Sequence, residues 1–406
     1  MEAMRSAARE HGGPSRVAEQ REKGEPTARE RIDALLDPGS FEETGGLAGE
    51  ARWNPETNEL LGLSPHAFVG GAGRVGRLRA RRRPRDGPRR PRDVARPQAG
   101  PPRGPRSEGF DGETPRRRLG SVATILDLGY DYVPPLLGFD REVEMIDEVP
   151  VVAALLGPVV GFGASRAACS RFAIAANKTA RLFVAGPPVV EGAAGETVGN
   201  DDLGGAARHN GLIDAVADSE NDVFTAAARA FLSYVPLSAR DLPPRAGRPG
   251  SRRPGLGRPA TPDGAPRRRR DYHPNRRFRV SFFEIGERWG RSRVASELAR
   301  IGGAPVAVVS NDSRFDAGAL TAHAAAKQAR LLRLARTFHL PAVNFVDQPG
   351  IDVGARAERR GTIRAAVDAL AALYDLNSGY FAVIVRRCYG VGGAMQVDAG
   401  PEQQRF

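Results

Sequence analysis

Apolar strands and amphipathic helices alternate most clearly in the last third of the chain. Apolar runs of strand length lie at 305–309, 342–346 and 381–385. Helical patterns at about 318–338 and 362–374 separate them. Strands that alternate with helices of this length are typical of a parallel sheet with helices on its faces. The pattern therefore predicts an α/β layer with parallel strands and right-handed crossovers.

The first half of the chain contains a helix with a recognisable start. Thr27 and Glu30 have the spacing of a capping box, in which each residue bonds to the other's backbone amide. Apolar residues at helical spacing follow, and Pro38 marks the end. We expect a short amphipathic helix here, followed by a strand after Ser40.

Further strands and one more helix are predicted in the middle of the chain. Residues 149–156 are almost entirely apolar and are bounded by a Gly-Pro pair, which is typical of a strand covered on both faces. A second strand is predicted at 181–185. Ser219 has the character of a helix cap, and the apolar stripe that follows it ends at Pro236.

Two stretches rich in arginine, proline and glycine interrupt these patterns, at about 77–118 and 247–277. Such stretches cannot bury enough surface to offset the entropy lost on ordering. The whole chain carries 60 Lys and Arg against 48 Asp and Glu, a net charge of +12, and the two stretches hold this excess. We expect solvated inserts. The alternative is a nucleic-acid contact at 81–90 and 267–270, but aromatic residues for base stacking are almost absent there.

The cysteines and histidines argue against several classes of protein. Cys169 and Cys388 lie in different halves and form neither a disulfide framework nor a metal knuckle, so we expect a reduced, cytoplasmic setting. The six histidines lack metal-ligand spacing, and no metal site is predicted. Residues 1–21 contain no apolar core of a signal peptide, and no run of about 18 apolar residues occurs, so no membrane span is expected.

Two short motifs recur in the two halves of the chain. The sequence SFEE at 40–43 returns as SFFE at 281–284. An apolar strand precedes a glycine-rich turn at 161–164 and again at 390–394. Because the motifs keep the same order and a similar separation, we predict that the chain contains a duplicated domain.

Each glycine-rich turn leads from a strand into a helix, where backbone N–H groups lack helical partners. Such groups bind anions or the oxyanions of transition states, and glycine lets a ligand approach the main chain. Donors of this kind are typically worth about 2.7 to 4 kcal/mol each in transition-state stabilisation. The alternative is that both turns only end strands. The candidate residues are Gly161, Phe162, Gly163, Ala164, Gly390, Val391, Gly392 and Gly393.

Other uses of such turns have less support. A dinucleotide site needs G-x-G-x-x-G/A and an acidic residue about 20 positions further on, where Arg181 stands. A phosphate loop needs a lysine, and none lies near either turn. Ser165, Ser170 and the two cysteines lack a partner base, so no side-chain nucleophile is predicted. Enolate chemistry without a metal remains.

Six segments carry a further pattern, at 25–46, 183–205, 281–292, 299–311, 346–350 and 361–389. In combination they resemble the carboxyltransferase (β) subunit of biotin-dependent acyl-CoA carboxylases. The resemblance implies an α/β fold of two tandem crotonase-like (ClpP/crotonase) domains with Arg/Pro/Gly-rich irregular inserts. The amino-terminal domain would span 1–240, a connector 241–280 and the carboxyl-terminal domain 281–406.

The same resemblance implies a division of labour between the turns. The turn at 161–164 would hold the thioester oxygen of an acyl-CoA, and the turn at 390–393 would hold the ureido oxygen of biotin. Carboxybiotin on a separate carrier would release carbon dioxide, and the biotin enolate would remove the α-proton of the acyl-CoA, whose enolate captures the carbon dioxide. A biotin carboxylase or biotin carrier subunit would be the partner. The family forms homo-oligomers, usually hexamers, with sites between domains of different subunits.

The sequence departs from the family pattern in three places. The two arginine-rich stretches replace family-like segments, and the chain is expected to stop at Phe406, short of the helices that end its relatives. Two alternatives therefore stand beside a carboxyltransferase. One is a catalytically inactive assembly partner, and the other is a subunit of a biotin-dependent decarboxylase.

A few other residues carry expectations. Asp347 can either cap the turn that follows it or act in catalysis. Trp289 and Phe282 are expected in the core. Four basic residues at helical spacing predict a solvated helix face rather than a site for CoA phosphates. They are Lys327, Arg330, Arg333 and Arg336.

Overall fold

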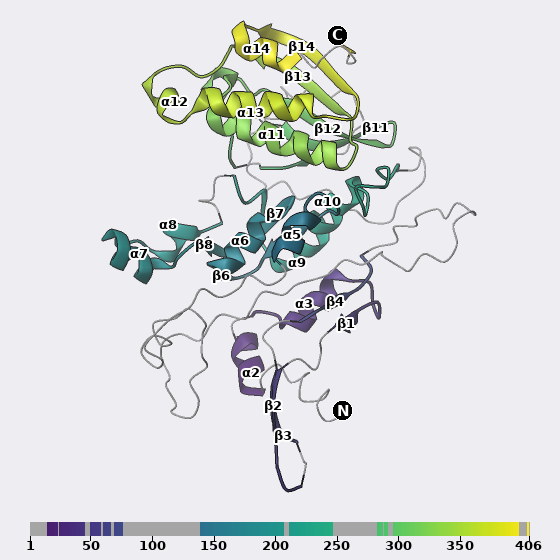
Figure 1. The fold of residues 1–406 in the computed structure, drawn as a ribbon, viewed down its shortest axis with the longest axis vertical. Coiled ribbons are helices and arrows are strands. Elements are labelled where there is room, and N and C mark those ends of the chain that lie inside the picture. Colours follow the sequence, from purple (N-terminus) through teal and green to yellow (C-terminus); the bar gives the residue numbers. More distant parts are fainter. Residues whose placement is uncertain are drawn as a thin grey trace, which may run out of the picture.

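The computed structural model describes residues 14–22, 24–44, 49–57, 60–65, 69–75, 139–206, 211–246, 282–286, 288–290, 295–397 and 404–405. Both arginine-rich stretches lie outside the described residues. The described elements fall into three groups along the long axis of the molecule (Figure 1). No helix in the described segments combines the length and the apolar character that a membrane crossing would need.

A six-stranded sheet forms the carboxyl-terminal group, with the strand order β10-β11-β12-β13-β14-β15. Its strands are β10 (Phe282–Glu284), β11 (Ala295–Ile301), β12 (Ala304–Ser310), β13 (Ala342–Gln348), β14 (Tyr380–Cys388) and β15 (Gln404–Arg405). β10, β11 and β12 pair antiparallel, and β12 to β15 pair parallel. The predicted β-α-β-α-β series with parallel strands is confirmed.

Two long helices, α11 (Ala322–Thr337) and α13 (Thr362–Tyr374), pack side by side over this sheet (Figure 1). α11 begins later than predicted, because Thr321 caps it by accepting a hydrogen bond from the amide of Ala324 at 3.2 Å. The residues before the cap form the short turn η4 (Asp316–Gly318). The shorter helices α12 (Ala355–Arg359) and α14 (Gly390–Val397) complete this group.

The middle group is built on a parallel three-stranded sheet in the order β5-β7-β9. Its strands are β5 (Val152–Leu155), β7 (Phe172–Ala176) and β9 (Ala215–Ala217), and β6 (Pro158–Val160) pairs parallel with β8 (Arg181–Phe183). The helices are α5 (Phe139–Met145), α6 (Phe162–Ala168), α7 (Pro187–Ala194), α8 (Asn200–Gly204), α9 (Glu220–Asp222), the π-helical segment η1 (Val223–Ala228) and α10 (Arg229–Tyr234).

A strand lies within the predicted range 149–156, but it is shorter than predicted and is not covered on both faces. β5 is shorter, lies at one side of its three-stranded sheet and exposes Ala154. The strand buried at every position is β7, which lies between β5 and β9. The Gly157-Pro158 pair does end β5, but a new strand, β6, begins directly at Pro158.

The first group contains helices α2 (Pro14–Glu22) and α3 (Ala28–Leu35) and strands β1 (Glu42–Thr44), β2 (Gly49–Trp53), β3 (Leu60–Pro65) and β4 (Gly70–Ala72). The predicted capping box is confirmed, with Thr27 and Glu30 each bonded to the other's backbone amide.

The predicted helix cap at Ser219, in the middle group, is also confirmed, since its hydroxyl accepts from the amide of Asp222 at 3.2 Å.

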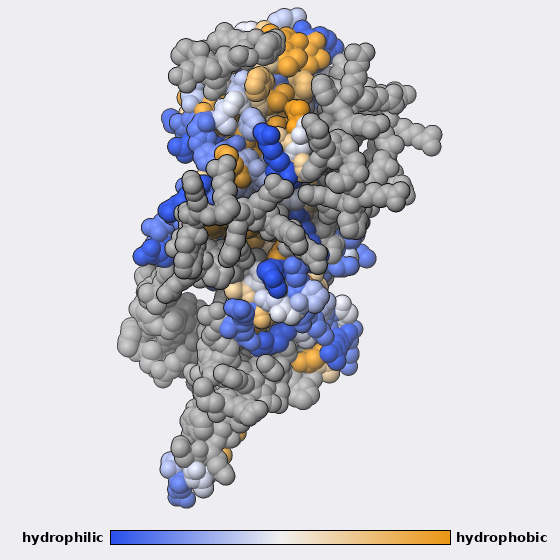
Figure 2. Space-filling model, turned by 90° about the vertical axis from the view of Figure 1, so that its right-hand side faces the viewer, coloured by the Kyte–Doolittle hydropathy of each residue, from blue (hydrophilic) through white to orange (hydrophobic). Residues whose placement is uncertain are grey.

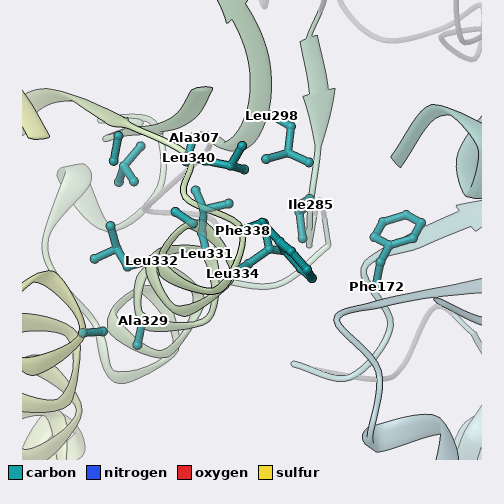
Figure 3. Packing of buried hydrophobic residues seen from close by; sticks show 14 of the residues in the cluster. Phe172, Ile285, Leu298, Ala307, Ala329, Leu331, Leu332, Leu334, Phe338 and Leu340 are labelled. Carbon is teal, nitrogen blue, oxygen red and sulfur yellow. The ribbon is translucent and has the colours of Figure 1, made fainter. Parts of the chain in front are cut away.

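One hydrophobic core joins the middle and carboxyl-terminal groups. Phe172 of β7 stacks on Phe231 of α10 with ring centroids 4.9 Å apart and meets Phe283 of β10 at 5.2 Å. Phe338 and buried leucines of α11 belong to the same cluster, and Figure 3 shows them on the side of Ile285 away from Phe172. Full burial of a side chain of this size contributes roughly 1.5 to 3 kcal/mol. The two groups therefore share their largest source of stability.

Candidate active site

The first predicted turn joins β6 to α6 through Gly161. This glycine has φ 60° and ψ −121°, a backbone conformation that residues with a side chain rarely adopt. Its amide donates to the carbonyl of Phe183 at 3.1 Å, which ties the turn to β8. The chain therefore changes from strand to helix within one residue, and only glycine fits without strain.

Only part of this turn is available to a ligand. The amide of Ala164 donates to the carbonyl of Gly161 at 3.0 Å, and the methyl group of Ala164 is buried in a small core with Leu155 and Leu182. The amides of Phe162 and Gly163 occupy the first turn of α6, where no helical acceptor exists. These two amides are the donors that the first turn can offer.

The second turn repeats this arrangement between β14 and α14. Gly390 has φ 60°, the same value as Gly161. The amide of Gly393 donates to the carbonyl of Tyr389 at 2.9 Å, so it is used within the turn. The amides of Gly390, Val391 and Gly392 precede the first intrahelical bond of α14 and are the donors that this turn can offer.

Close backbone packing explains the two later glycines of the second turn. A Cβ atom on Gly392 would lie 2.7 Å from the backbone nitrogen of Ile351, and one on Gly393 would lie 2.6 Å from the carbonyl carbon of Cys388. Real Cβ atoms essentially never come so close to backbone. The second turn is therefore fitted to the loop that follows β13.

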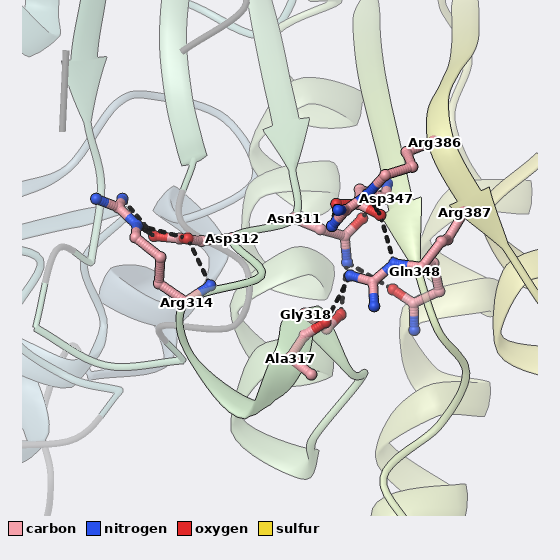
Figure 4. Close-up of polar contacts among 9 residues, drawn as sticks. All are labelled: Asn311, Asp312, Arg314, Ala317, Gly318, Asp347, Gln348, Arg386 and Arg387. Carbon is pink, nitrogen blue, oxygen red and sulfur yellow. Dashed lines mark hydrogen bonds and ion pairs between the residues drawn. The ribbon is translucent and has the colours of Figure 1, made fainter. Parts of the chain in front are cut away.

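An ion-pair network lies at the ends of β13 and β14 beside the second turn (Figure 4). The nearly buried carboxylate of Asp347 accepts from Arg386 Nη2 at 2.8 Å and from Arg387 Nε at 2.7 Å. Burial by itself raises the pKa of Asp347, but hydrogen bonds and charges from the two arginines outweigh it and hold the pKa below its ordinary value. Asp347 is therefore ionised at neutral pH.

Asn311 extends this network to the loop before α11. Its amide nitrogen donates to the carbonyl of Gly318 at 2.9 Å and to Gln348 Oε1 at 2.6 Å. Gln348 in turn donates to the carbonyl of Gly350 at 2.7 Å. The arginine pair and these amides were not predicted from the sequence as site residues, although they lie within or beside the quoted segments 299–311, 346–350 and 361–389.

Neither turn carries an activated nucleophile among the described residues. Ser165 is exposed, and the buried Ser170 hydroxyl donates to the carbonyl of Ala167 at 2.8 Å. Burial raises the pKa of Cys169, with a smaller effect from the charge of Glu142, and burial also raises the pKa of Cys388. Both thiols therefore stay protonated at neutral pH, and the main chain is left as the chemically useful feature of each turn.

The predicted solvated face of α11 is wrong for two of its four basic residues. Lys327 is buried, and its Nζ lies 4.0 Å from Glu284 Oε1. Arg330 reaches the fully buried Asp214, 2.7 Å away. The reason is that the loop with Gly286 and Trp289 packs against the stem of Lys327, which the helix pattern alone could not reveal.

Other expectations have mixed outcomes. Trp289 is buried, as predicted. The side chain of Phe282 lies outside what the structure describes. Asp347 contacts two arginines, and no described bond makes it a turn cap.

Exposed apolar side chains lie next to both turns. Val160 directly precedes the first turn, and Val184 lies beside it in space, because its carbonyl oxygen is 3.8 Å from where a Cβ atom on Gly161 would stand; the side chain of Val184 is 87% exposed. The residues near the second turn are Ile384, Val385, Tyr389 and Val391. Figure 2 shows hydrophobic surface at the upper end of the molecule, where Figure 1 places β14 and α14.

The two turns lie far apart within one chain. Figure 1 shows α6 in the middle group and α14 at the end of the molecule, with the long helices of the carboxyl-terminal group at intermediate height.

The parallel α/β layers of both groups are those of the crotonase-fold class of proteins, as the comparisons with solved structures show. A model of the family described as carboxyl transferase domain matches residues 137–405. The chain is 31% identical to the putative propionyl-CoA carboxylase beta chain of Bacillus subtilis, over 95% of this chain and 76% of that protein. It is 29% identical to the carboxyltransferase subunit of Haloferax mediterranei propionyl-CoA carboxylase, over 97% and 77%. The chain belongs to the carboxyl transferase domain family, among the carboxyltransferase subunits of biotin-dependent acyl-CoA carboxylases.

Solved structures agree with this fold. Transcarboxylase 12S, solved as a hexamer with hydrolysed methylmalonyl-coenzyme A bound, is 22% identical, has a TM-score of 0.73, and covers 100% of this chain and 80% of its own. A single-chain, multi-domain long-chain acyl-CoA carboxylase is 24% identical with a TM-score of 0.68, and the match covers 98% of this chain and 41% of that protein. These likenesses establish the crotonase-like α/β fold.

Proposed function

We propose that this chain transfers a carboxyl group from carboxybiotin to the α carbon of an acyl-CoA. The observation that carries the proposal is the repeated turn, in which a glycine at φ 60° ends a strand and opens a helix in each half. Two such turns provide two separate sets of main-chain donors, and the reaction develops negative charge on two oxygens. Family membership assigns the acyl-CoA class of substrate.

We assign the amides of Phe162 and Gly163 to the thioester oxygen of the acyl-CoA. As the α-proton leaves, negative charge grows on that oxygen, and fixed N–H groups stabilise the charge without reorganising. The ion pair between Arg166 and Glu142 joins α6 to α5 and supports the helix that carries these amides. Gly161 and Ala164 belong to the turn as structural residues, because their own amides are bonded within the fold.

We assign the amides of Gly390, Val391 and Gly392 to the ureido oxygen of biotin, and Gly393 to the support of the turn. The ureido oxygen is neutral before the reaction and gains negative charge during it. Backbone amides suit such an oxygen, because they donate hydrogen bonds to it without carrying a full positive charge. Biotin supplies the carboxyl group when it is bound, and the acyl-CoA accepts it. The chain's residues orient both groups and stabilise the charge on them.

We further propose that the functional site forms between two copies of this chain. The separation of the turns in one chain and the exposed valines beside the first turn support this arrangement, as does the hexamer reported for transcarboxylase 12S. A biotin carrier or biotin carboxylase subunit would dock at the same place. The repeated motifs support a division into 1–240, 241–280 and 281–406, because SFEE leads into β1 and SFFE leads into β10.

The direct test is an assay of carboxyl transfer in the reverse direction. Purified protein is incubated with free biotin and malonyl-CoA or methylmalonyl-CoA, and formation of acetyl-CoA or propionyl-CoA is followed. We expect biotin-dependent loss of the carboxyl group. A well-folded oligomer without any turnover would contradict the proposal and leave the inactive assembly partner in its place.

A pair of glycine variants sharpens this test. Gly392→Ala places a methyl group 2.7 Å from the Ile351 nitrogen, so the second turn must shift, and we expect the rate to fall on the order of 10²-fold. Gly379→Ala is the matched control at the other end of β14, where the added atom meets only the movable ring of Phe381 at 3.2 Å. The control is expected to keep the wild-type rate.

A further inference from the structure

We propose that Asp347 is a positioning residue that fixes the second turn through Arg386 and Arg387. This inference rests on the proposed function, because it assigns to that turn a support outside the turn itself. It concerns the two arginines at the end of β14 and the carboxylate near the end of β13, all of which Figure 4 shows together.

The pairing of β13 with β14 changes register at this place. Val346 stands opposite Ile384, but Gln348 stands opposite Cys388, so β14 contains extra residues between the two pairs. Successive side chains of a regular strand point to opposite faces, whereas a bulge turns them from that pattern. The irregular segment of β14 lets Arg386 and Arg387, which are neighbours in the chain, reach the same carboxylate.

The contacts of Asp347 hold the irregular segment from two sides. Arg386 donates to both carboxylate oxygens, at 2.8 Å to Oδ2 and 3.3 Å to Oδ1, and Arg387 donates to Oδ1 at 2.7 Å. Arg387 also donates to the carbonyl of Ala317 at 2.8 Å, which anchors it to the loop before α11. The backbone amide of Asp347 donates to Asn311 Oδ1 at 3.1 Å, which fixes the carboxylate's own position.

The turn begins where these contacts end. Tyr389 follows the arginines by two residues, and its amide donates to the carbonyl of Gln348 at 2.9 Å. The next residue is Gly390, the first donor of the second turn. A change at Asp347 therefore moves the strand end from which the donors project, while α6 and the first turn are elsewhere in the molecule. A misplacement of about 1 Å at a catalytic group can cost on the order of 10²-fold in rate.

The test compares Asp347→Asn with Asp312→Asn. Asp312 is an equally buried aspartate after β12, and its carboxylate accepts from Arg314 at 2.8 and 2.9 Å without any described contact to the turn. We expect Asp347→Asn to lower kcat by about 10²-fold and to raise KM for biotin, with KM for the acyl-CoA unchanged. Asp312→Asn is expected to leave kcat and both KM values unchanged. Equal effects of the two substitutions, or an equal rise of both KM values for Asp347→Asn, would overturn the inference.

Amide hydrogen exchange provides a readout that does not depend on activity. The amides of Tyr389 and Gly393 are hydrogen-bonded, so their exchange reports whether the turn stays closed, and the bonded amide of Gly161 is the reference. We expect faster exchange at Tyr389 and Gly393 in Asp347→Asn, with Gly161 unchanged. Unchanged exchange at the second turn would refute the positioning role of Asp347 even if the wild-type chain proved inactive, so the two proposals fail separately. If Asp347→Asn does not fold, Arg386→Gln removes one arm at a half-exposed side chain and must give the same pattern more weakly.

Discussion

At the scale of single residues, two carboxylates, Asp214 and Glu297, are buried in the fold next to basic side chains. Asp214 accepts from the amide of Ala173 at 2.8 Å and from Arg330 at 2.7 Å. Glu297 of β11 is also buried, with Glu284 and Lys327 as its charged neighbours. Burial, with a smaller effect from the charge of Glu284, raises the pKa of Glu297 well above its ordinary value of 4.5, and Lys327 only partly offsets this.

Glu297 therefore makes stability depend on pH in a definite direction. A carboxyl whose pKa is raised by folding contributes stability that is present below its ordinary pKa and lost as the pH rises through the raised value. Glu297→Gln cannot ionise, so its free energy of unfolding should increasingly exceed that of the wild type as the pH rises above 4.5. The gain is about 1.4 kcal/mol for each unit by which the pKa is raised. Urea denaturation from pH 4 to pH 8 measures the difference, and a difference that does not vary with pH would contradict this explanation.

At the scale of elements, helix starts are set by local hydrogen bonds to the residue that precedes each helix. Thr27 starts α3, Ser219 starts α9, and Thr321 starts α11, each by accepting a hydrogen bond from a backbone amide three residues later. Such a side chain supplies an acceptor for an amide that the helix itself leaves unpaired.

The cap of α3 predicts a specific loss of stability. Thr27→Ala removes the acceptor for the Glu30 amide, and we expect the free energy of unfolding to fall by about 1 kcal/mol. Chemical denaturation followed by circular dichroism measures the change. Thr197→Ala, at an exposed threonine after α7, is the comparison and should stay within about 0.5 kcal/mol of the wild type. Equal changes in the two variants would mean that the cap contributes nothing.

The local character of these signals explains which elements could be predicted. The caps at Thr27 and Ser219 and the strand-helix series at 304–388 depend on neighbouring residues, and the sequence predicted them, whereas the cap at Thr321 was not predicted. β7 was missed and β5 was assigned its burial, because a strand's place in a sheet depends on its neighbours in space. The contacts of Asp347 with Arg386 and Arg387 cross two strands and a bulge, so the sequence pattern could not show them. Lys327 was misjudged because the loop that covers it is distant in the sequence.

At the scale of the whole molecule, one core links the group that carries the first turn to the group that carries the second. Phe172 and Phe231 come from the middle group, and Phe283 comes from β10 of the six-stranded sheet. Arg330 of α11 bonds to Asp214, which adds a polar link between the same groups. The shared core thus fixes the positions of the two turns relative to each other within a chain, and in the proposed arrangement the site forms when copies assemble.

The shared core predicts that the two groups unfold together. Phe172→Ala should lower the free energy of unfolding by about 3 to 5 kcal/mol. The probes of both groups should still report one unfolding transition, with a lower midpoint. Leu242→Ala, at a side chain that is 82% exposed, serves as the control and should change little. Thermal unfolding watched by tryptophan fluorescence and by hydrogen exchange of β7 and β13 is the measurement. Two separate transitions in the variant would show that the groups are independent.

The most direct test of a site built from two turns on different copies is complementation between two inactive variants. Gly161→Ala strains the first turn and Gly392→Ala displaces the second, so each variant alone should lose carboxyl transfer. When the two chains are co-expressed and isolated as mixed oligomers, about one quarter of the sites should combine two intact turns, and activity should return to about that fraction of the wild type. Mixed oligomers that remain as inactive as either variant alone would contradict a shared site.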